Sequence, residues 1–418
     1  MSAGAWEPVR VLDLDLLAPS THFDARGPGG RLHVLLRLHS HNVGVVELDL
    51  AADEPLAGRL EGLRALCAPQ IRQHQQLVGC AVTWAGTEPP CLARRRERLR
   101  EAPPISVLIA THDRPQHLAR CLDAVLTQSH RALDVVVVDN ARSSDETERM
   151  LRAERYAGVT YVRDDVPGLG RAHNTGLEHA RGEILAITDD DVVPDHEWLA
   201  ALAEVFVEEA AGCVTGLILP LELRTREQAW VEQHGGFARG FERRVYSTRT
   251  PPEGDPLFPF TAGRFGSGAN MAFSRRALER IGGFDPALGA GTRAMGGDDL
   301  AAFAATLLAG ETLIYQPDAL VKHLHHDHYA AVRRMAHGYG VGLGAYLTSL
   351  VATRPSLLFE IIRRVPAGLS HLSSPDSAKN RNIQADYPQT LVRTERLGLL
   401  KGPFSYVASR RRIAAQTS

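Results

Sequence analysis

From Pro104 onward the chain alternates short apolar runs with helical patterns, and this alternation constrains its fold more than any other feature. A run that is apolar throughout is typical of a strand buried on both faces of a sheet. Strands that alternate with helices predict a mostly parallel α/β sheet with right-handed crossovers. The expected strands are Ile105–Ala110, Val135–Val138, Val159–Val162, Ile184–Ile187 and Cys213–Leu219, and the expected helices are Leu118–Val125, Ser144–Ala153, Leu169–Ala180 and Asp195–Glu209.

The two regions that flank this stretch have different patterns of apolar residues. Residues 1–102 open with alternating apolar runs that predict antiparallel strands, and they end in a charged helix followed by Pro103 and Pro104. After Tyr329 the pattern is helical, and the polar stretch Ser370–Tyr387 predicts a loop. We therefore expect a β-rich N-terminal module with a charged linker at 1–102, an α/β domain at 103–330, and a helical C-terminal extension with a basic tail at 331–418.

Charge and cysteine content exclude several classes of protein. Lys+Arg 47 against Asp+Glu 49 gives a net charge of -2, so the chain lacks the basic field of a nucleic-acid binder. The five cysteines are odd in number and form no C-x-x-C, which argues against a disulfide scaffold or a zinc ribbon. They are interpreted as reduced thiols of a cytoplasmic protein, in line with an N-terminus that has no signal-peptide pattern. The five are Cys67, Cys80, Cys91, Cys121 and Cys213.

No stretch reaches the ~18 apolar residues that span a bilayer. The nearest, Gly338–Thr353, is uncharged but short and rich in glycine. It predicts a buried helix, with an interfacial segment resting on a membrane as the alternative. The basic tail at Arg410–Arg412 is a solvated end or a contact with anionic lipid. The expected location is cytoplasmic, with peripheral contact to the inner face of the membrane left open.

Polar side chains follow three of the predicted strands. Thr111–Pro115, Asp139–Asn140 and Asp189–Asp191 each come directly after an apolar run. Ligands of such sheets lie beyond the carboxyl ends of the strands. Three carboxylates after a buried strand would be costly to bury without a counter-charge, and their hard oxygen ligands suit Mg²⁺ or Mn²⁺. A solvated turn is the alternative for this acidic run.

A second acidic pair, Asp298 and Asp299, precedes the helical stripe Leu300–Leu308. The simple interpretation is that Asp298 caps the helix and Asp299 interacts with its dipole. The functional interpretation is a general base, placed where Gly296 and Gly297 let a substrate approach.

A histidine cluster follows a further short expected strand, Thr312–Tyr315. As a metal motif it is not specific, and we expect most of its members on the surface, with one able to complete the shell of a cation. The cluster consists of His323, His325, His326 and His328.

These motifs, in this order, resemble the family-2 nucleotide-sugar glycosyltransferases, which have the Rossmann-like GT-A fold. The resemblance covers about residues 103–330. It rests on SVLIATHDRPQHLARCLDAVL, VVVVDNARSSDET, PGLGRAHNTGLEHARGEILAITDDDVVPDHEWL, GSGANMAFSRRALERIGGFDPALGAGT, GGDDLAAFAATLLAG and YQPDALVKHLHH.

The resemblance implies a role for each matching position. The acidic run becomes a D-x-D element in which Asp189 and Asp191 hold Mg²⁺ or Mn²⁺, while Asp190 faces the ribose or donor sugar. Asp299 is the implied catalytic base, with Asp298 as the competing candidate, and His323 is a candidate metal ligand. The implied nucleotide-sugar contacts are Thr111, Arg114, Asp139, Gly168, Arg171, Asn174, Gly268 and Asn270.

The implied activity is inverting transfer of a sugar from a nucleotide-diphosphate donor, most commonly a UDP-sugar, to the hydroxyl of an unidentified acceptor. Cation and helix-end amides would stabilise the leaving diphosphate, and no covalent intermediate is needed. The sequence departs from the family at Asp113, where Asn is usual, and at Asp298, where Glu is usual.

Three rival classes have specific arguments against them. A dehydrogenase would carry G-x-G-x-x-G after the first strand, but Gly168–Gly170 is followed by His173 and lies elsewhere. A sugar nucleotidyltransferase would carry a Gly-rich loop where this chain has Thr111–Pro115. A catalytically degenerate fold acting as a scaffold would not need all the acidic residues of the site. This chain has them together, at Asp139, Asp189, Asp191 and Asp299.

Overall fold

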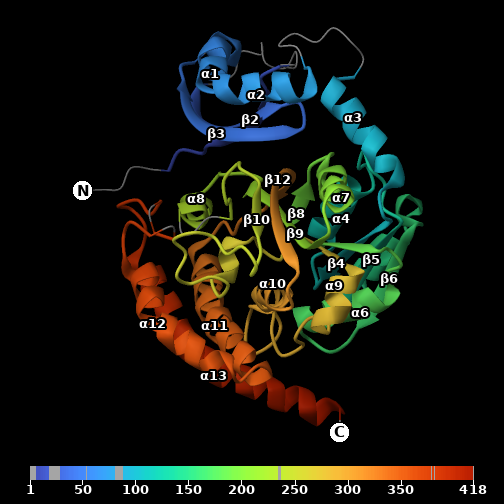
Figure 1. Cartoon of the computed structure of the whole chain (residues 1–418), viewed down its shortest axis with the longest axis vertical. Helices are drawn as coiled ribbons and strands as arrows, with labels where there is room; N and C mark the ends of the chain where they lie inside the picture. Colours follow the sequence, from blue (N-terminus) through green and yellow to red (C-terminus); the bar gives the residue numbers. More distant parts are fainter. Residues whose placement is uncertain are drawn as a thin grey trace.

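The computed structural model describes residues 6–17, 29–52, 54–80, 88–233, 237–377, 379–380 and 382–417. Two sheets organise this part of the chain, a three-stranded N-terminal sheet and a nine-stranded central sheet. In Figure 1 the small sheet lies at the top, the central sheet lies below it, and the C-terminal helices run along the lower left.

The central sheet has the order β10-β12-β9-β11-β7-β4-β5-β6, with β8 paired to β12. Its four strands β7, β4, β5 and β6 are parallel, and β9 and β12 are parallel to each other. The bounds are β4 Ile105–Thr111, β5 Asp134–Asn140, β6 Val159–Asp164, β7 Ile184–Asp189, β8 Val192–Pro194, β9 Ala211–Pro220, β10 Arg244–Tyr246, β11 Asn270–Ser274 and β12 Thr312–His323. The six expected strands are therefore confirmed.

Three strands were not expected, and one of them decides the geometry of the sheet. β11 lies between β7 and β9 and is antiparallel to both. Consequently β9 and β12 run in the same direction as β7, and their carboxyl ends meet the same edge as the ends of β4 and β5. The start of the antiparallel β11 meets that edge too. The sheet thus places residues after β4, β5, β7 and β12, and residues before β11, side by side.

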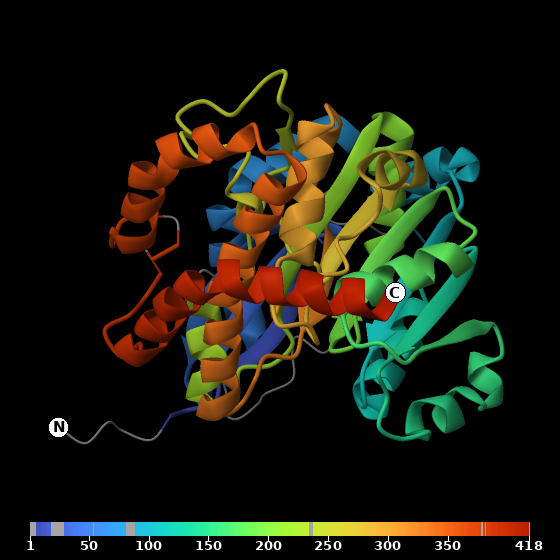
Figure 2. The same ribbon diagram turned by 90° about the horizontal axis from the view of Figure 1, so that it is seen from below.

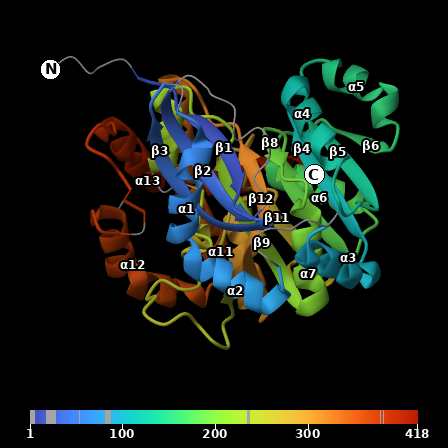
Figure 3. The ribbon, with the colours of Figure 1, turned by 90° about the horizontal axis from the view of Figure 1, so that it is seen from above.

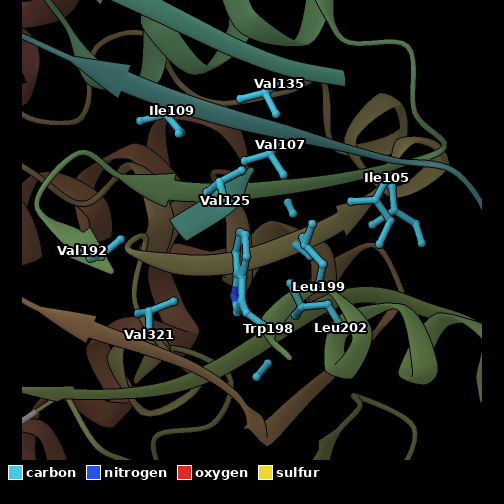
Figure 4. Packing of buried hydrophobic residues seen from close by; sticks show 14 of the residues in the cluster. Ile105, Val107, Ile109, Val125, Val135, Val192, Trp198, Leu199, Leu202 and Val321 are labelled. Atoms are coloured by element: carbon cyan, nitrogen blue, oxygen red, sulfur yellow. The ribbon is translucent and has the colours of Figure 1, made fainter. Parts of the chain in front are cut away.

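Two apolar layers hold helices against the two faces of the central sheet. Alternate residues of β4 point to opposite faces, so Val107 belongs to one cluster and Leu108 to the other. Trp198 lies near the centre of the first cluster, beside Leu199 and Leu202 (Figure 4). The helices of the domain are α4 Pro115–Val125, α5 Glu146–Leu151, α6 Leu169–His179, α7 Trp198–Glu208, α8 Arg226–Gln233, α9 Arg275–Ile281 and α10 Asp298–Leu308.

The N-terminal sheet is separate from the central sheet, in the order β1-β2-β3. The expectation of antiparallel strands is correct for β2 and β3 but wrong for β1, which is parallel to β2. A hairpin turn joins β2 to β3, whereas β1 and β2 are linked through residues that lie outside the described ranges. The elements are β1 Arg10–Asp15, β2 Gly30–Leu38, β3 His41–Leu50, α1 Leu60–Leu66, α2 Ala68–Val78 and α3 Pro90–Arg98.

The expected charged linker is a packed helix. Arg95 of α3 is 3% exposed, and its guanidinium donates to Glu204 of α7 at 2.9 Å and to Ser40 at 2.7 Å. A second contact joins Arg37 of β2 to Asp195 at 2.7 Å. Figure 3 shows the N-terminal sheet lying over the strands of the central sheet. Charged side chains therefore connect the two sheets, and the division of the chain into independent units stays a prediction.

The C-terminal extension consists of α11 Tyr329–Thr353, α12 Leu357–Ser373 and α13 Gln389–Thr417. The segment Gly338–Thr353 is part of α11, and most of its small residues are buried, as the buried-helix interpretation predicts. Gly340 and Gly344 lie so close to α13 that an added Cβ would overlap its backbone. Figure 2 shows α13 crossing the outside of the molecule. Among the residues described here, no helix is long and apolar enough to cross a membrane.

Candidate active site

The acidic run that follows β7 is bound to the end of the neighbouring strand β4. The Thr111 hydroxyl donates to Asp190 Oδ2 at 2.7 Å. Arg114 donates to Asp191 Oδ2 at 3.0 Å and lies 3.4 Å from Asp190 Oδ1. Asp190 is 6% exposed and directed at these two partners, so its carboxylate supports the site rather than lining it. Thr111 and Arg114 therefore contact the acidic run. From the sequence they were expected to contact the nucleotide sugar.

Asp189 and Asp191 have opposite electrostatic environments. Burial raises the pKa of Asp189 above its usual range, and the charge of Asp191 raises it further. Burial would also raise the pKa of Asp191, but the imidazole of His323 and the guanidinium of Arg114 lower it below its usual range. Two carboxylates at such close quarters repel each other, and a shared cation would relieve that repulsion.

His323 ends β12 and faces the acidic run from the other side. Its Nε2 lies 3.4 Å from Asp191 Oδ1, and its Nδ1 lies 2.8 Å from Nδ1 of His325. His325 Nε2 in turn lies 2.6 Å from the carboxylate of Glu232. His325 is 2% exposed, so the expectation of surface histidines is wrong for this member of the cluster.

This chain of contacts fixes the tautomers of both rings. A carboxylate only accepts, so His325 Nε2 carries a proton toward Glu232 and its Nδ1 accepts from His323. With His325 neutral, His323 carries a proton on Nδ1, and its Nε2 faces Asp191 Oδ1 at 3.4 Å. That nitrogen donates to the carboxylate when the ring is protonated and is the one left for a metal ion when the ring is neutral. Histidines that bind metals are oriented in this way by a carboxylate behind them. Glu232 on α8 is the residue that sets the arrangement.

The second acidic pair lies at the start of α10, and the structure separates its two members. Asp298 is 4% exposed and lies 3.5 Å from His173, and neither its Oδ2 nor the His173 ring has a hydrogen-bond partner among the described residues. The N-cap position belongs to Gly297, so the expectation that Asp298 caps the helix is wrong. Asp298 is an interior carboxylate without a direct route to an acceptor.

Asp299 is the more accessible carboxylate and is held by backbone amides. Gly268, which precedes β11, donates its N–H to Asp299 Oδ2 at 2.9 Å, and Leu300 donates to Oδ1 at 2.8 Å. Burial, followed by the charge of Asp298, raises the pKa of Asp299 to about 6. A carboxylate with a raised pKa near the start of β11 is suited to accept a proton from a hydroxyl.

Asp299 lies beside the acidic run at one edge of the sheet, because the Gly268 that holds it precedes β11 and β11 pairs with β7 at Asn270↔Thr188, next to Asp189. Tyr339 of α11 is 42% exposed, and its pKa is raised by burial and then by the charges of Asp299, Asp189 and Asp191. Sequence reasoning missed Tyr339, and it missed Glu232 as well, because neither belongs to a motif near the end of a strand.

Two of the expected nucleotide contacts, Asp139 and Arg171, lie near the end of β5 and on α6. Asp139 ends β5 and accepts from the Tyr161 hydroxyl at 3.0 Å, while its buried Oδ1 has no partner within the described ranges. Arg171 lies on the first turn of α6 and pairs with Asp164 at 3.0 Å. Burial raises the pKa of Asp139. An unpartnered buried acceptor beside an open edge is suited to a donor group of a ligand.

Other expected contacts serve the scaffold. Asn270 is fully buried, accepts from the Trp198 indole and donates to the carbonyl oxygens of Leu217 and Ala319. Asn174 is similarly committed, because its amide both accepts from and donates to the backbone of Phe284. The side chains of Asn270 and Asn174 are therefore bound within the chain, and their expected contacts with the donor stay predictions.

The N-terminus of α6 is also occupied. Gly168 donates its N–H to Asn140 Oδ1 at 2.9 Å, and Leu169 donates to the carbonyl of Ala290 at 2.8 Å. Gly168 has φ +149 and packs against the loop that precedes α10. These two amides are thus engaged within the chain, and the expected role of helix-end amides toward a diphosphate stays a prediction.

The donor set at the edge fits a divalent cation. Asp189 and Asp191 supply hard oxygen atoms, and His323 supplies a nitrogen whose tautomer is fixed. The repulsion that raises the pKa of Asp189 is the observation that favours a cation there.

The fold defines an α/β domain with an acidic edge formed by strand ends. Residues 106–282 match the family model described as Glycosyl transferase family 2. The resemblance stated from the motifs is therefore confirmed for this segment, and the GT-A architecture with it.

Individual relatives are distant. An uncharacterized glycosyltransferase of Nostoc sp. is 25% identical over 185 residues, which are 44% of this chain and 54% of that protein. The glucosyl-dolichyl phosphate glucuronosyltransferase of Haloferax volcanii is 22% identical over 237 residues, 52% of this chain and 68% of that protein. The match thus spans about half the length of the Nostoc relative. Among solved structures, a mannosyltransferase of Pyrobaculum calidifontis in complex with GDP-Man and Mn²⁺ is 23% identical, covers 78% of this chain and 81% of its own, and has a TM-score of 0.41.

Proposed function

We propose that this chain is a metal-dependent, inverting glycosyltransferase that moves a sugar from a nucleotide-diphosphate donor to an acceptor hydroxyl. The observation that carries the proposal is that Asp189 and Asp191 at the end of β7 lie beside the start of β11, where the Gly268 amide holds Asp299. The family match over residues 106–282 supports the class of reaction. UDP is the first donor nucleotide to test, and GDP is the second.

Asp189, Asp191 and His323 would hold Mg²⁺ or Mn²⁺. When bound, the cation supplies positive charge for the diphosphate of the donor. Arg114 lies beside the same carboxylates and contributes a fixed cation. Asp139 would accept a hydrogen bond from the base or ribose through its unpartnered Oδ1.

Asp299 would act as the general base. Its Oδ2 is oriented by the Gly268 amide, so the carboxylate is held at the start of β11. The acceptor hydroxyl gives its proton to Asp299 while its oxygen forms a bond to the anomeric carbon, and the bond from that carbon to the diphosphate oxygen breaks with the electron pair leaving on the diphosphate. This single displacement inverts the anomeric centre.

We infer that the acceptor is presented at the surface of an anionic membrane. Large apolar side chains are exposed along the outside of α12 and α13, among them Phe359 at 75% and Phe404 at 78%. The others on these two helices are Leu358, Ile362, Val365, Leu369, Leu397, Leu400 and Val407.

The charge of the same helices complements an anionic surface. Exposed cations at Arg363, Arg393, Arg396, Lys401 and Arg410–Arg412 outnumber the exposed acidic side chain Glu360. Exposed apolar groups beside cations are typical of helices that bind an interface. The α13 residue Tyr406 donates to Asp285 at 2.8 Å, which joins this surface to the loop that leads into Asp298 and Asp299. The Haloferax relative, whose name specifies a lipid-linked acceptor, supports the same class of acceptor.

Two experiments test the proposal separately. A calorimetric titration of UDP and GDP with and without Mn²⁺, followed by hydrolysis assays of the matching nucleotide sugars, tests the activity. Co-sedimentation with phosphatidylglycerol and phosphatidylcholine vesicles tests the surface. We expect binding to the anionic vesicles that Phe404→Ser weakens. Leu66→Ser, which changes a 64% exposed apolar residue on α1, should leave that binding intact. Absence of binding to either vesicle would remove the membrane part and leave the transferase part standing.

A further inference from the structure

Four metal-ligating side chains meet inside the N-terminal module, far from the acidic edge of the central sheet in sequence. They are His39, His74, Cys80 and Cys91. All four are buried, and one donor atom from each lies within 4.8 Å of the others. The four residues are spread over positions 39 to 91 and form no C-x-x-C, so the sequence pattern does not reveal the cluster.

The ligands come from different elements of the module. His39 lies in the turn between β2 and β3, His74 lies on α2, Cys80 follows the left-handed Gly79 that ends α2, and Cys91 lies on the first turn of α3. His39 itself has φ +58, a conformation that non-glycine residues seldom adopt. The backbone at His39 is thus held in an uncommon form that turns the ring toward the other three residues.

A second observation is that one nitrogen of each imidazole lacks a hydrogen-bond partner within the described part of the chain. Nε2 of His39 and Nε2 of His74 are buried and have no hydrogen-bond partner among the described residues. Buried polar atoms in folded proteins are nearly always paired, and an orphaned one calls for an explanation such as an ion. His39 Nδ1 lies 3.3 Å from Asp15 Oδ2, so the carboxylate binds the other side of the ring. A carboxylate behind a histidine is the arrangement that orients metal ligands.

We propose that His39, His74, Cys80 and Cys91 bind one Zn²⁺ ion in a closed tetrahedral site. Two thiolates and two neutral imidazoles form a donor set that tetrahedral zinc prefers, and the two negative charges balance those of the ion. Zn–S bonds of about 2.3 Å and Zn–N bonds of about 2.0 Å place donor atoms about 3.3–3.8 Å apart. The observed cluster, within 4.8 Å, needs only a small contraction to reach that spacing. Binding releases the two thiol protons to solvent.

The role of this site is structural, because four protein ligands leave no position for a substrate. It joins the β2–β3 turn, the end of α2 and the start of α3. Cys67, Cys80 and Cys91 share the same apolar core, so the ion would reinforce a core built from few elements. The neighbouring His41 contacts Asp318 of β12 at 2.6 Å, so the zinc-bound turn also fixes the face that docks on the central sheet.

The experiment uses the full chain, expressed with zinc in the medium and purified in reducing buffer without chelators. Elemental analysis should find about one zinc per chain. Cys91→Ser should lose that zinc, whereas Cys67→Ser, which removes a thiol from the same core but outside the cluster, should keep it. Asp191→Asn should also keep it, which separates this site from the proposed cation site of the central sheet.

Cobalt supplies a readout that does not depend on any variant folding. Wild-type protein stripped of metal and reloaded with Co²⁺ should show the visible bands of tetrahedral cobalt and a thiolate charge-transfer band. Titration of thiols in denaturant tests whether Cys80 and Cys91 form a disulfide instead of binding zinc. Such a disulfide would leave three of the five thiols reactive. Five reactive thiols together with bound zinc support the proposal.

Three results would each overturn it. One is wild-type protein that contains no zinc and shows no tetrahedral cobalt spectrum after reduction. Another is a Cys91→Ser chain that retains as much zinc as Cys67→Ser. The third is a Cys80–Cys91 disulfide in protein purified from a reducing cytoplasm.

Discussion

The acidic edge of the central sheet and the histidine–cysteine cluster of the N-terminal module both bring buried polar side chains together, but by different means. At the edge, the residues follow consecutive strands, and the parallel sheet collects them. In the module, they come from a turn, two helices and the residue after a helix, and no repeat in the sequence relates them. The comparison indicates that a site built on strand ends faces solvent and substrate, whereas a site closed by separate elements serves the fold. Substitutions at the edge should therefore remove chemistry and spare stability, and substitutions in the module should do the reverse.

The largest effect is expected at Asp299. Asp299→Asn keeps the shape of the side chain and its bond from Gly268, so folding and donor binding should persist while transfer falls by about 10²–10⁴-fold. Asp298→Asn is the matched control and should lose far less, because that carboxylate is buried against His173. Steady-state kinetics with a saturating acceptor measure both. More than about a tenth of wild-type turnover in Asp299→Asn would remove Asp299 from the role of base.

The same residue predicts the acid side of the pH profile. Burial raises the pKa of Asp299 to about 6, and a base must be ionised to accept a proton. Activity should therefore be full above pH ~7 and fall about tenfold per pH unit below the pKa. A profile that stays flat down to pH ~4.5 would show that no group with this raised pKa takes part.

A stability effect of similar size, without loss of chemistry, is expected at Arg95. Arg95→Met removes the buried guanidinium that faces Glu197, Glu204 and Asp318, so these carboxylates lose one of their cationic partners. Breaking such a pair costs about 3–5 kcal/mol of the free energy of unfolding. Arg96→Met is the control, since Arg96 is 71% exposed on the same helix and should cost about 0–1 kcal/mol. Urea unfolding measures both, and equal costs for the two variants would contradict a docking role for Arg95.

Much of the central domain was predictable because its signals are local. Wholly apolar runs predicted the strands β4, β5, β6, β7 and β9. Once a strand was placed, the polar residues at its end were placed as well. The antiparallel β11 was missed because Asn270, which looks like a ligand contact in sequence, is a polar residue of the core. The parallel pairing of β1 was missed because alternation predicts a strand but not its direction.

The least predictable feature of the site is the set of carboxylates that contact its histidines and orient them. Glu232 lies on α8, 91 residues before His323 in the chain, and only the fold brings it to His325. The same is true of Asp15 and His39 in the module. Contacts of this kind follow from packing of whole elements, so a single sequence carries no spacing that reveals them.

The smallest effect is expected at Glu232, which orients His325 and His323. Glu232→Gln removes the carboxylate that fixes the tautomers of His325 and His323, and loss of such a partner weakens metal binding by about 10–100-fold. Glu227→Gln on the same helix is the matched control. Calorimetric titration of Mn²⁺ measures the change. Equal Mn²⁺ affinity in the two variants would mean that His323 is not a ligand.

The central claim is that Asp189 and Asp191 make donor binding depend on a divalent cation. Titration of UDP and GDP into wild type and Asp191→Asn, each with Mn²⁺ and with excess EDTA, tests it most directly. The account predicts that one nucleotide binds wild type tightly with Mn²⁺ and weakly with EDTA, and that Asp191→Asn binds it weakly in both. Equal binding with Mn²⁺ and EDTA in the wild type would contradict the account.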